Sequence, residues 1–121
     1  MIKLTFALVR RPDFTREAFQ AYWFERHAPL VASVREDLAI LRYVQLHSLP
    51  AEDSELLRQS RGAPEPFDGV AQLWWEGLEA CAKASSSPRG QAAARALLAD
   101  ERTFIDLSRS PLWWGEERQV F

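Results

Sequence analysis

Apolar and polar positions alternate at the start of the chain and then change to a helical spacing in the next segment. In residues 2–9 the even positions are all large and apolar, whereas the odd positions include Lys3 and Thr5. This alternation predicts a strand with its even side against helices and its odd side in a wetter environment. In residues 14–30 apolar side chains recur every three or four positions, which predicts an amphipathic helix. Its inner face and the continuation of that face consist of Phe19, Trp23, His27, Leu30 and Val34.

Both ends of this helix carry sequence signals. Thr15 is a good N-cap, because its hydroxyl can accept a hydrogen bond from a backbone N–H that the helix leaves unpaired. Pro29 has no N–H and disfavours helical geometry at the residue before it, so we expect the helix to end or kink there. His27 lies on the apolar stripe just before this point and is expected to point inward. It is either a functional group or a core histidine whose hydrogen bonds are satisfied.

Residues 41–47 also alternate and are predicted to form a second strand. One of its sides carries a phenol, an amide and an imidazole, from Tyr43, Gln45 and His47. We expect this polar side to face away from the main helix layer. It would then line a solvated cavity, or it would be the exposed face of an antiparallel sheet.

Residues 67–75 are predicted to form the third strand, with Val70, Gln72 and Trp74 on its wetter side. The connection before this strand, residues 48–68, is rich in Glu, Ser, Arg and Pro, and a short helix is expected to start at Pro50 and run through Leu57. A connection of this length is often a lid or a segment that contacts a partner, although it also fits a tolerated surface insertion.

The rest of the chain predicts a second helix and a last strand. Residues 77–99 have a helical pattern interrupted at 85–88, Asp100 is expected to cap a further short turn, and residues 116–121 are expected to form the last strand. The resulting order, β-α-β-β-α-β, is that of a ferredoxin-like α+β domain with an antiparallel sheet. One face of this sheet has no helices over it. We therefore expect a homodimer in which two copies pack these sheet faces together.

The composition limits the classes of protein to which this chain can belong. The chain has 121 residues, average apolar and charged fractions, and a net charge of −2, so it offers no basic surface for nucleic acid. A single cysteine excludes an internal disulfide, and no apolar run approaches the roughly 20 residues of a membrane span. We therefore expect a cytoplasmic protein without membrane or nucleic-acid partners. No spacing of metal ligands, glycine-rich phosphate loop or nucleophile motif is present.

Several segments carry a resemblance to a known family. In order along the chain they are Lys3-Leu4 to Arg11-Pro12, Tyr22-Trp23 with Glu25-Arg26-His27-Ala28-Pro29-Leu30, Arg42-Tyr43-Val44-Gln45 with His47, Asp68-Gly69-Val70-Ala71-Gln72-Leu73-Trp74, and Asp100-Glu101 to Phe104-Ile105-Asp106. Together they resemble the EthD domain family. The resemblance implies one domain over residues 1–121 and a dimeric α+β barrel of two ferredoxin-like subunits. Residues 49–67 match no motif of the family.

The resemblance leaves the chemistry open, because related barrels carry out many reactions. An imidazole can give or take a proton at neutral pH, so we expect His27 to be the general acid or base, with Tyr43 and His47 orienting the substrate. The expected binding residues are Thr5, Trp23, Gln45, Gln72 and Trp74. The predicted function is that of a lyase or isomerase without a cofactor, acting on a small aromatic or polyketide-like compound. The alternative is an accessory protein that binds a small hydrophobic molecule without turnover. Haem on His27 is a third and weaker possibility.

Overall fold

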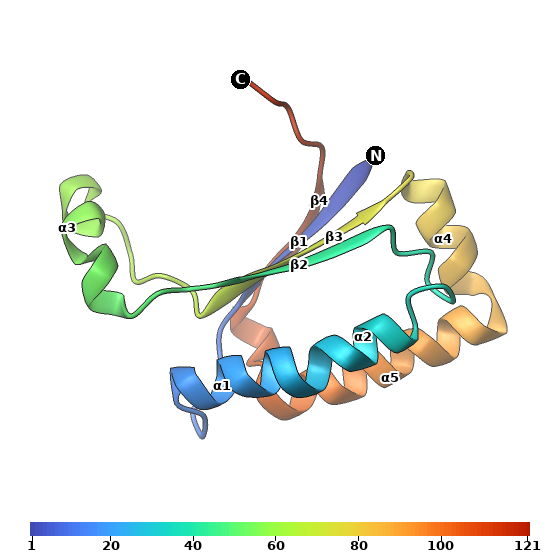
Figure 1. Ribbon diagram of the computed structural model, residues 1–121, viewed down its shortest axis with the longest axis horizontal. Coiled ribbons are helices and arrows are strands. Elements are labelled where there is room, and N and C mark those ends of the chain that lie inside the picture. Colours follow the sequence, from blue (N-terminus) through green and yellow to red (C-terminus); the bar gives the residue numbers. More distant parts are fainter.

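The computed structural model describes residues 1–121 and contains one antiparallel sheet with a layer of helices on one side (Figure 1). Its strands are β1 (Ile2–Leu8), β2 (Arg42–His47), β3 (Gly69–Trp75) and β4 (Leu112–Gly115). Their order across the sheet is β2-β3-β1-β4, and each neighbouring pair is antiparallel. This is the predicted ferredoxin-like arrangement, in which the two central strands are β1 and β3.

The helix layer is formed by the first helical segment and by the long helix near the end of the chain. The helices are α1 (Arg16–Tyr22), the π-helical turn η1 (Trp23–His27), α2 (Ala28–Ser33), α3 (Ala51–Arg61), α4 (Leu78–Ser86), α5 (Pro88–Phe104) and the short 3-10 turn η2 (Leu107–Arg109). Figure 1 shows α1, α2 and α5 beneath the sheet, whereas α3 stands apart at one end. No helix combines the length and the apolar content that a bilayer crossing requires.

The sequence signals at the first helix are confirmed. The Thr15 hydroxyl accepts a hydrogen bond from the backbone N–H of Ala18 at 3.1 Å. Directly before Pro29 the helix widens into η1, where the N–H of Ala28 donates to the carbonyl of Trp23. Because the missing proline N–H would interrupt a regular helix, the π turn lets the chain continue as α2 with the proline in its first turn.

Two predicted boundaries are wrong. The predicted break at residues 85–88 is present, with the Ser87 side chain accepting from the N–H of Gly90, but α5 then continues to Phe104. Asp100 therefore lies inside α5 and caps nothing. The last strand is β4 rather than residues 116–121, because its register already pairs Gly115 with Lys3 near the start of β1.

The strand register decides which side chains meet the helices. The even positions of β1 and the odd positions of β3 face the helix layer, as predicted, and Leu8, Leu73 and Trp75 belong to the core. Tyr43 lies opposite Leu73, which places Tyr43, Gln45 and His47 on this same covered face. The prediction that the polar side of β2 faces away from the helices is therefore wrong. Beneath the sheet these side chains form hydrogen bonds with one another and with the backbone carbonyl of Trp23.

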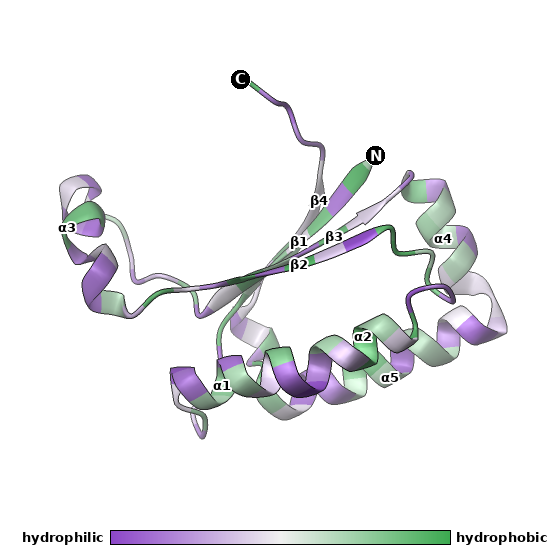
Figure 2. Cartoon of the chain, viewed as in Figure 1, coloured by the Kyte–Doolittle hydropathy of each residue, from purple (hydrophilic) through white to green (hydrophobic).

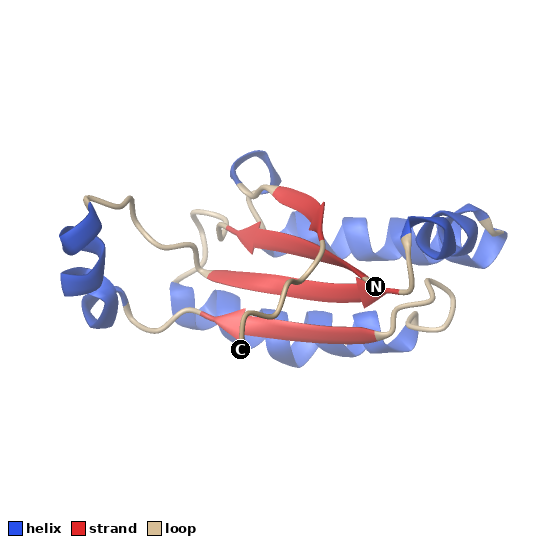
Figure 3. Ribbon diagram, turned by 90° about the horizontal axis from the view of Figure 1, so that it is seen from above, coloured by secondary structure: helices blue, strands red, loops and turns tan.

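The other side of the sheet, which we call the open face, has no helix over it. It consists of Lys3, Thr5, Ala7, Arg42, Val44, Leu46, Val70, Gln72, Trp74 and Trp113. Figure 3 looks onto this face, and the C-terminal segment crosses in front of the strands. That segment is hydrophilic except at its end (Figure 2), and Glu117 accepts a hydrogen bond from the indole N–H of Trp74.

Candidate functional site

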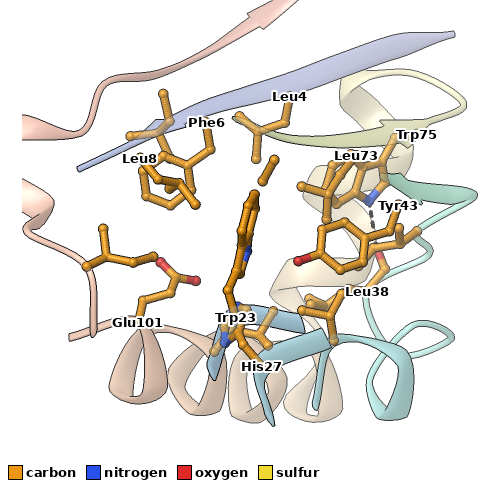
Figure 4. Close-up of a pocket in the computed structure, with 16 residues that line it drawn as sticks. Leu4, Phe6, Leu8, Trp23, His27, Leu38, Tyr43, Leu73, Trp75 and Glu101 are labelled. Carbon is orange, nitrogen blue, oxygen red and sulfur yellow. Dashed lines mark hydrogen bonds between the residues drawn. The ribbon is translucent and has the colours of Figure 1, made fainter. Parts of the chain in front are cut away.

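A cavity of about 130 Å³ lies between the sheet and the helix layer (Figure 4). Fourteen of its sixteen lining residues are hydrophobic, and they come from all four strands and from η1, α2 and α5. Apart from indole rings, the polar groups on its wall are the imidazole of His27, the carboxyl of Glu101 and the phenol of Tyr43. A few polar groups in an apolar cavity are typical of a site for a small molecule.

His27 is held by a carboxylate of the neighbouring helix. Its Nδ1 lies 2.7 Å from Oδ2 of Asp100, and the other carboxylate oxygen of Asp100 accepts a hydrogen bond from the Tyr22 hydroxyl. Because a carboxylate accepts, we assign the proton of the neutral ring to Nδ1. Nε2 forms no hydrogen bond with the protein, so its lone pair is available as a base.

Burial controls the protonation of His27. The side chain is 7% exposed, and this burial lowers its pKa, because the charged imidazolium is poorly solvated there. The hydrogen bond and the charge of Asp100 act in the opposite direction but do not reverse the shift. His27 is therefore neutral near pH 7.

Glu101 follows Asp100 on α5, and its side chain turns into the cavity (Figure 4). Burial raises the pKa of this carboxyl to about 7, and the negative charge of Asp100 adds to the shift. The carboxyl group has no hydrogen-bond partner in the protein that would stabilise its ionised form. Near neutral pH it is thus a proton donor next to the cavity.

Tyr43 is held by the amide of Gln45. The Gln45 side-chain N–H₂ donates to the Tyr43 hydroxyl at 2.7 Å and to the carbonyl of Trp23 in η1 at 3.0 Å. Burial raises the pKa of Tyr43 to about 12, so its phenol stays protonated. Since its oxygen accepts from Gln45, the phenol can donate its own hydrogen to a molecule in the cavity.

His47 has a different role from His27. Its Nε2 donates to Oε1 of Gln45 at 2.7 Å, and its ring stacks on Trp23 with centroids 4.6 Å apart. Burial lowers its pKa. It is not among the residues that line the cavity, and its expected contact with a substrate stays a prediction. Its position supports Gln45 and, through Gln45, the orientation of Tyr43.

The expected binding residues divide between the two sides of the sheet. Trp23 lines the cavity and Gln45 lies beside it, next to Tyr43. Three others, namely Thr5, Gln72 and Trp74, lie on the open face. The structure does not bring these three together with His27, because strand alternation sends the odd positions of β1 and the even positions of β3 away from the helices. Their role in binding stays a prediction.

Asp100 and Glu101 were missed as site residues. The expected helix end before Asp100 removed both from the inner face of a helix. The available signal was the spacing of Leu97, Glu101 and Phe104, which continues one helical face without a glycine or proline to interrupt it. In the structure, no group of three or more His, Cys, Asp or Glu side chains is arranged to hold a metal ion.

Comparisons with known proteins agree with this fold. The model of the EthD domain matches residues 11–108. The chain is 28% identical over 120 residues to the conidial pigment biosynthesis dehydratase EthD of Metarhizium robertsii, covering 95% of this chain and 81% of that protein.

Two solved structures share the fold over almost the whole chain. One is an EthD family protein of Bacillus halodurans, with 21% identity, a TM-score of 0.63 and coverage of 98% and 99% of the two chains. The other is a dimeric ferredoxin-like protein of unknown function from Bacteroides fragilis, with 11% identity, a TM-score of 0.57 and coverage of 96% and 95%. Since the family model matches most of its length, the chain belongs to the EthD domain family.

Proposed function

We propose that this protein is a lyase that needs no cofactor and removes water from a small ring-bearing carbonyl compound. The observation that carries the proposal is the pairing of a neutral His27 Nε2 with a protonated Glu101 carboxyl on the wall of one apolar cavity. The name of the Metarhizium relative supports the choice of a dehydratase among lyases and isomerases.

The size of the cavity limits the reacting part of the substrate. An apolar cavity of about 150 Å³ accommodates one benzene molecule. The cavity of about 130 Å³ here therefore suits about one ring, enclosed by side chains such as Phe6, Leu73 and Trp75. These walls exclude water, so hydrogen bonds and charges inside the cavity act more strongly than in solution.

In the proposed reaction three side chains act on the substrate and a fourth, Asp100, supports one of them. Nε2 of His27 takes the proton from a carbon next to the substrate carbonyl, and the Tyr43 hydroxyl donates a hydrogen bond to the developing enolate oxygen. The C–OH bond then breaks as Glu101 gives its proton to the leaving hydroxyl, which departs as water. Asp100 stabilises the imidazolium formed on His27. The net change is loss of water, and exchange with solvent returns Glu101 and His27 to their starting states.

The first prediction concerns turnover. A panel of single-ring hydroxyketones is incubated with the protein, and loss of water is followed by liquid chromatography and mass spectrometry. For a compound that the wild type converts, His27→Gln is expected to lower kcat by about 100-fold or more, because general base catalysis contributes that much. Arg95→Gln, at an exposed position on α5, is the control and should leave kcat within about twofold.

Two results would oppose the assignment. Tight binding without conversion of any compound would favour the alternative, an accessory protein that holds a hydrophobic ligand. Conversion with an unchanged kcat in His27→Gln would remove His27 from the reaction.

The second prediction concerns stability and pH. Glu101 has a pKa of about 7 in the folded protein and an ordinary value of 4.5 when unfolded. The folded state binds this proton more tightly than the unfolded state does, so the proton on Glu101 contributes to the unfolding free energy. This contribution is fully present below about pH 4.5 and is lost as the pH rises through about 7. Glu101→Gln has no such loss. We therefore compare the unfolding free energy of Glu101→Gln with that of the wild type at two pH values. The variant minus wild-type difference should be about 2–3 kcal/mol larger at pH 8 than at pH 4.5.

Urea unfolding at a series of pH values measures this difference. Glu76→Gln makes the same substitution at an exposed position outside the cavity and is the matched control. A difference for Glu101→Gln that stays constant with pH would mean that Glu101 ionises in the ordinary range, and that it cannot be the acid at neutral pH.

We also propose that two copies pair through their open faces. Leu46 and Trp113 are 57% and 51% exposed on this face, although a two-layer domain usually buries such side chains. The Bacteroides protein with the same fold is described as dimeric, which supports the proposal.

The third prediction tests this dimer by size-exclusion chromatography with light scattering. The wild type should have the mass of two chains, and Leu46→Glu should have the mass of one, because it places two carboxylates in an apolar contact. Leu98→Glu, on the outer side of α5, should remain dimeric. A monomeric wild type, or a dimeric Leu46→Glu, would contradict pairing through the open face.

A further inference from the structure

A second and larger cavity lies outside the site described above, where α3 joins the rest of the molecule. Its volume is about 590 Å³, and it shares no lining residue with the cavity that holds His27. Its walls come from the end of β1, the start of α1, the first residue of α3, residues 65–68 and η2. Figure 1 shows α3 set apart from both layers at this end of the sheet.

Two arginines on this wall are fixed by one buried carboxylate. The side chain of Asp68 is 7% exposed, and it accepts from Nη1 of Arg10 at 2.6 Å and from the Arg10 backbone N–H at 2.8 Å. Nε of Arg16 lies 3.5 Å from the same carboxylate, and Nη1 of Arg16 donates to the carbonyl of Leu49 at 2.6 Å. Both guanidinium groups are therefore held in place before any ligand binds.

A third arginine in the cleft has no such role. Arg109 in η2 lines the cavity and forms no ion pair or side-chain hydrogen bond with the protein. The Nη2 atoms of Arg10 and Arg16 are likewise without a hydrogen-bond partner. Pairing with Asp68 gives Arg10 and Arg16 a structural role, but Arg109 has no such role.

The balance of charge in the cleft is positive. Glu65 also lines it, but this side chain is 73% exposed and its carboxylate lies 3.4 Å from Nη2 of Arg58. Asp68 is thus the one buried carboxylate that faces three guanidinium groups. Guanidinium nitrogens pair with the oxygens of phosphate in fixed, often bidentate geometry. A dianion would neutralise the excess charge, whereas a single carboxylate would not.

The rest of the wall has apolar surface. Val9, Pro12, Pro66 and Phe67 contribute to it, and Phe67 is 40% exposed. The cavity is also much larger than a bare phosphate ion requires. We propose that this cleft binds a phosphomonoester of a small apolar molecule, with the phosphate on the arginines and the apolar part against Phe67.

Such a ligand would connect two parts of the chain. The arginines belong to the segment just after β1, to α1 and to η2, whereas Ala51 is the first residue of α3 and Phe67 lies in the segment that follows this helix. Occupation of the cleft would therefore restrict the movement of residues 50–68 relative to the sheet. This binding is independent of the proposed dehydration, because the two cavities have no residue in common.

The experiment titrates the full chain with phenyl phosphate in a calorimeter, with inorganic phosphate and phenol in parallel. Phenyl phosphate should bind saturably and more tightly than either of the other two probes. Arg109→Gln should weaken its binding by about tenfold, because one charged hydrogen-bonding partner is lost. Since the Arg109 side chain forms no ion pair or hydrogen bond with the protein, this variant is expected to fold normally. Arg95→Gln makes the same change in charge on the exposed side of α5 and should bind like the wild type.

Hydrogen exchange shows which segment of the chain is affected when phenyl phosphate binds. Phenyl phosphate should slow exchange in residues 50–68 of the wild type, and the same concentration should slow it less in Arg109→Gln. The proposal is overturned if phenyl phosphate does not bind saturably, if Arg109→Gln binds it as well as the wild type, or if Arg95→Gln weakens binding equally. Equal affinity for inorganic phosphate or for phenol would also overturn it, since one of the two parts of the ligand would then contribute nothing.

Discussion

The hydrogen bond between His27 and Asp100 is the interaction on which the site depends. It joins η1 to α5, the two segments that cover the sheet, and Tyr22 adds a second bond to the same carboxylate. The bond fixes the ring with Nδ1 toward α5, so that Nε2 is left for the cavity. The π turn matters here because it carries both Trp23 and His27 at the inner side of the helix.

Burial has opposite effects on the two ionisable groups of the cavity, although its cause is the same. A charged group is poorly solvated between the sheet and the helices, so the pKa of His27 falls and that of Glu101 rises. Both shifts favour the neutral form. A base and an acid consequently line the same cavity near pH 7, which is the condition that removal of water from a substrate requires. The same apolar packing that stabilises the fold therefore prepares the proposed chemistry.

Much of the fold could be predicted because its signals are local. The alternation in β1 and β3, the cap at Thr15 and the effect of Pro29 all follow from backbone geometry within a few residues. The side of β2 that faces the helices could not be predicted in this way. It depends on the register that places Tyr43 opposite Leu73 and on the carbonyl of Trp23 in another element, which accepts a hydrogen bond from Gln45. Gln45 in turn bonds Tyr43 and His47 on its own strand. Asp100 was misassigned for the same reason. Its partners Tyr22 and His27 lie more than 70 residues earlier in the chain, and no local pattern connects them.

Nitrogen NMR of the two histidine rings at pH 7 tests the central claim most directly, because the structure assigns them opposite tautomers. His27 should carry its proton on Nδ1, where Asp100 accepts it, and His47 should carry its proton on Nε2, where Gln45 accepts it. His47→Gln assigns the remaining signals to His27. A spectrum in which His27 is protonated on Nδ1 and unprotonated on Nε2 would support the account. A His27 protonated on Nε2, or on both nitrogens, would contradict it, since the cavity would then contain no base.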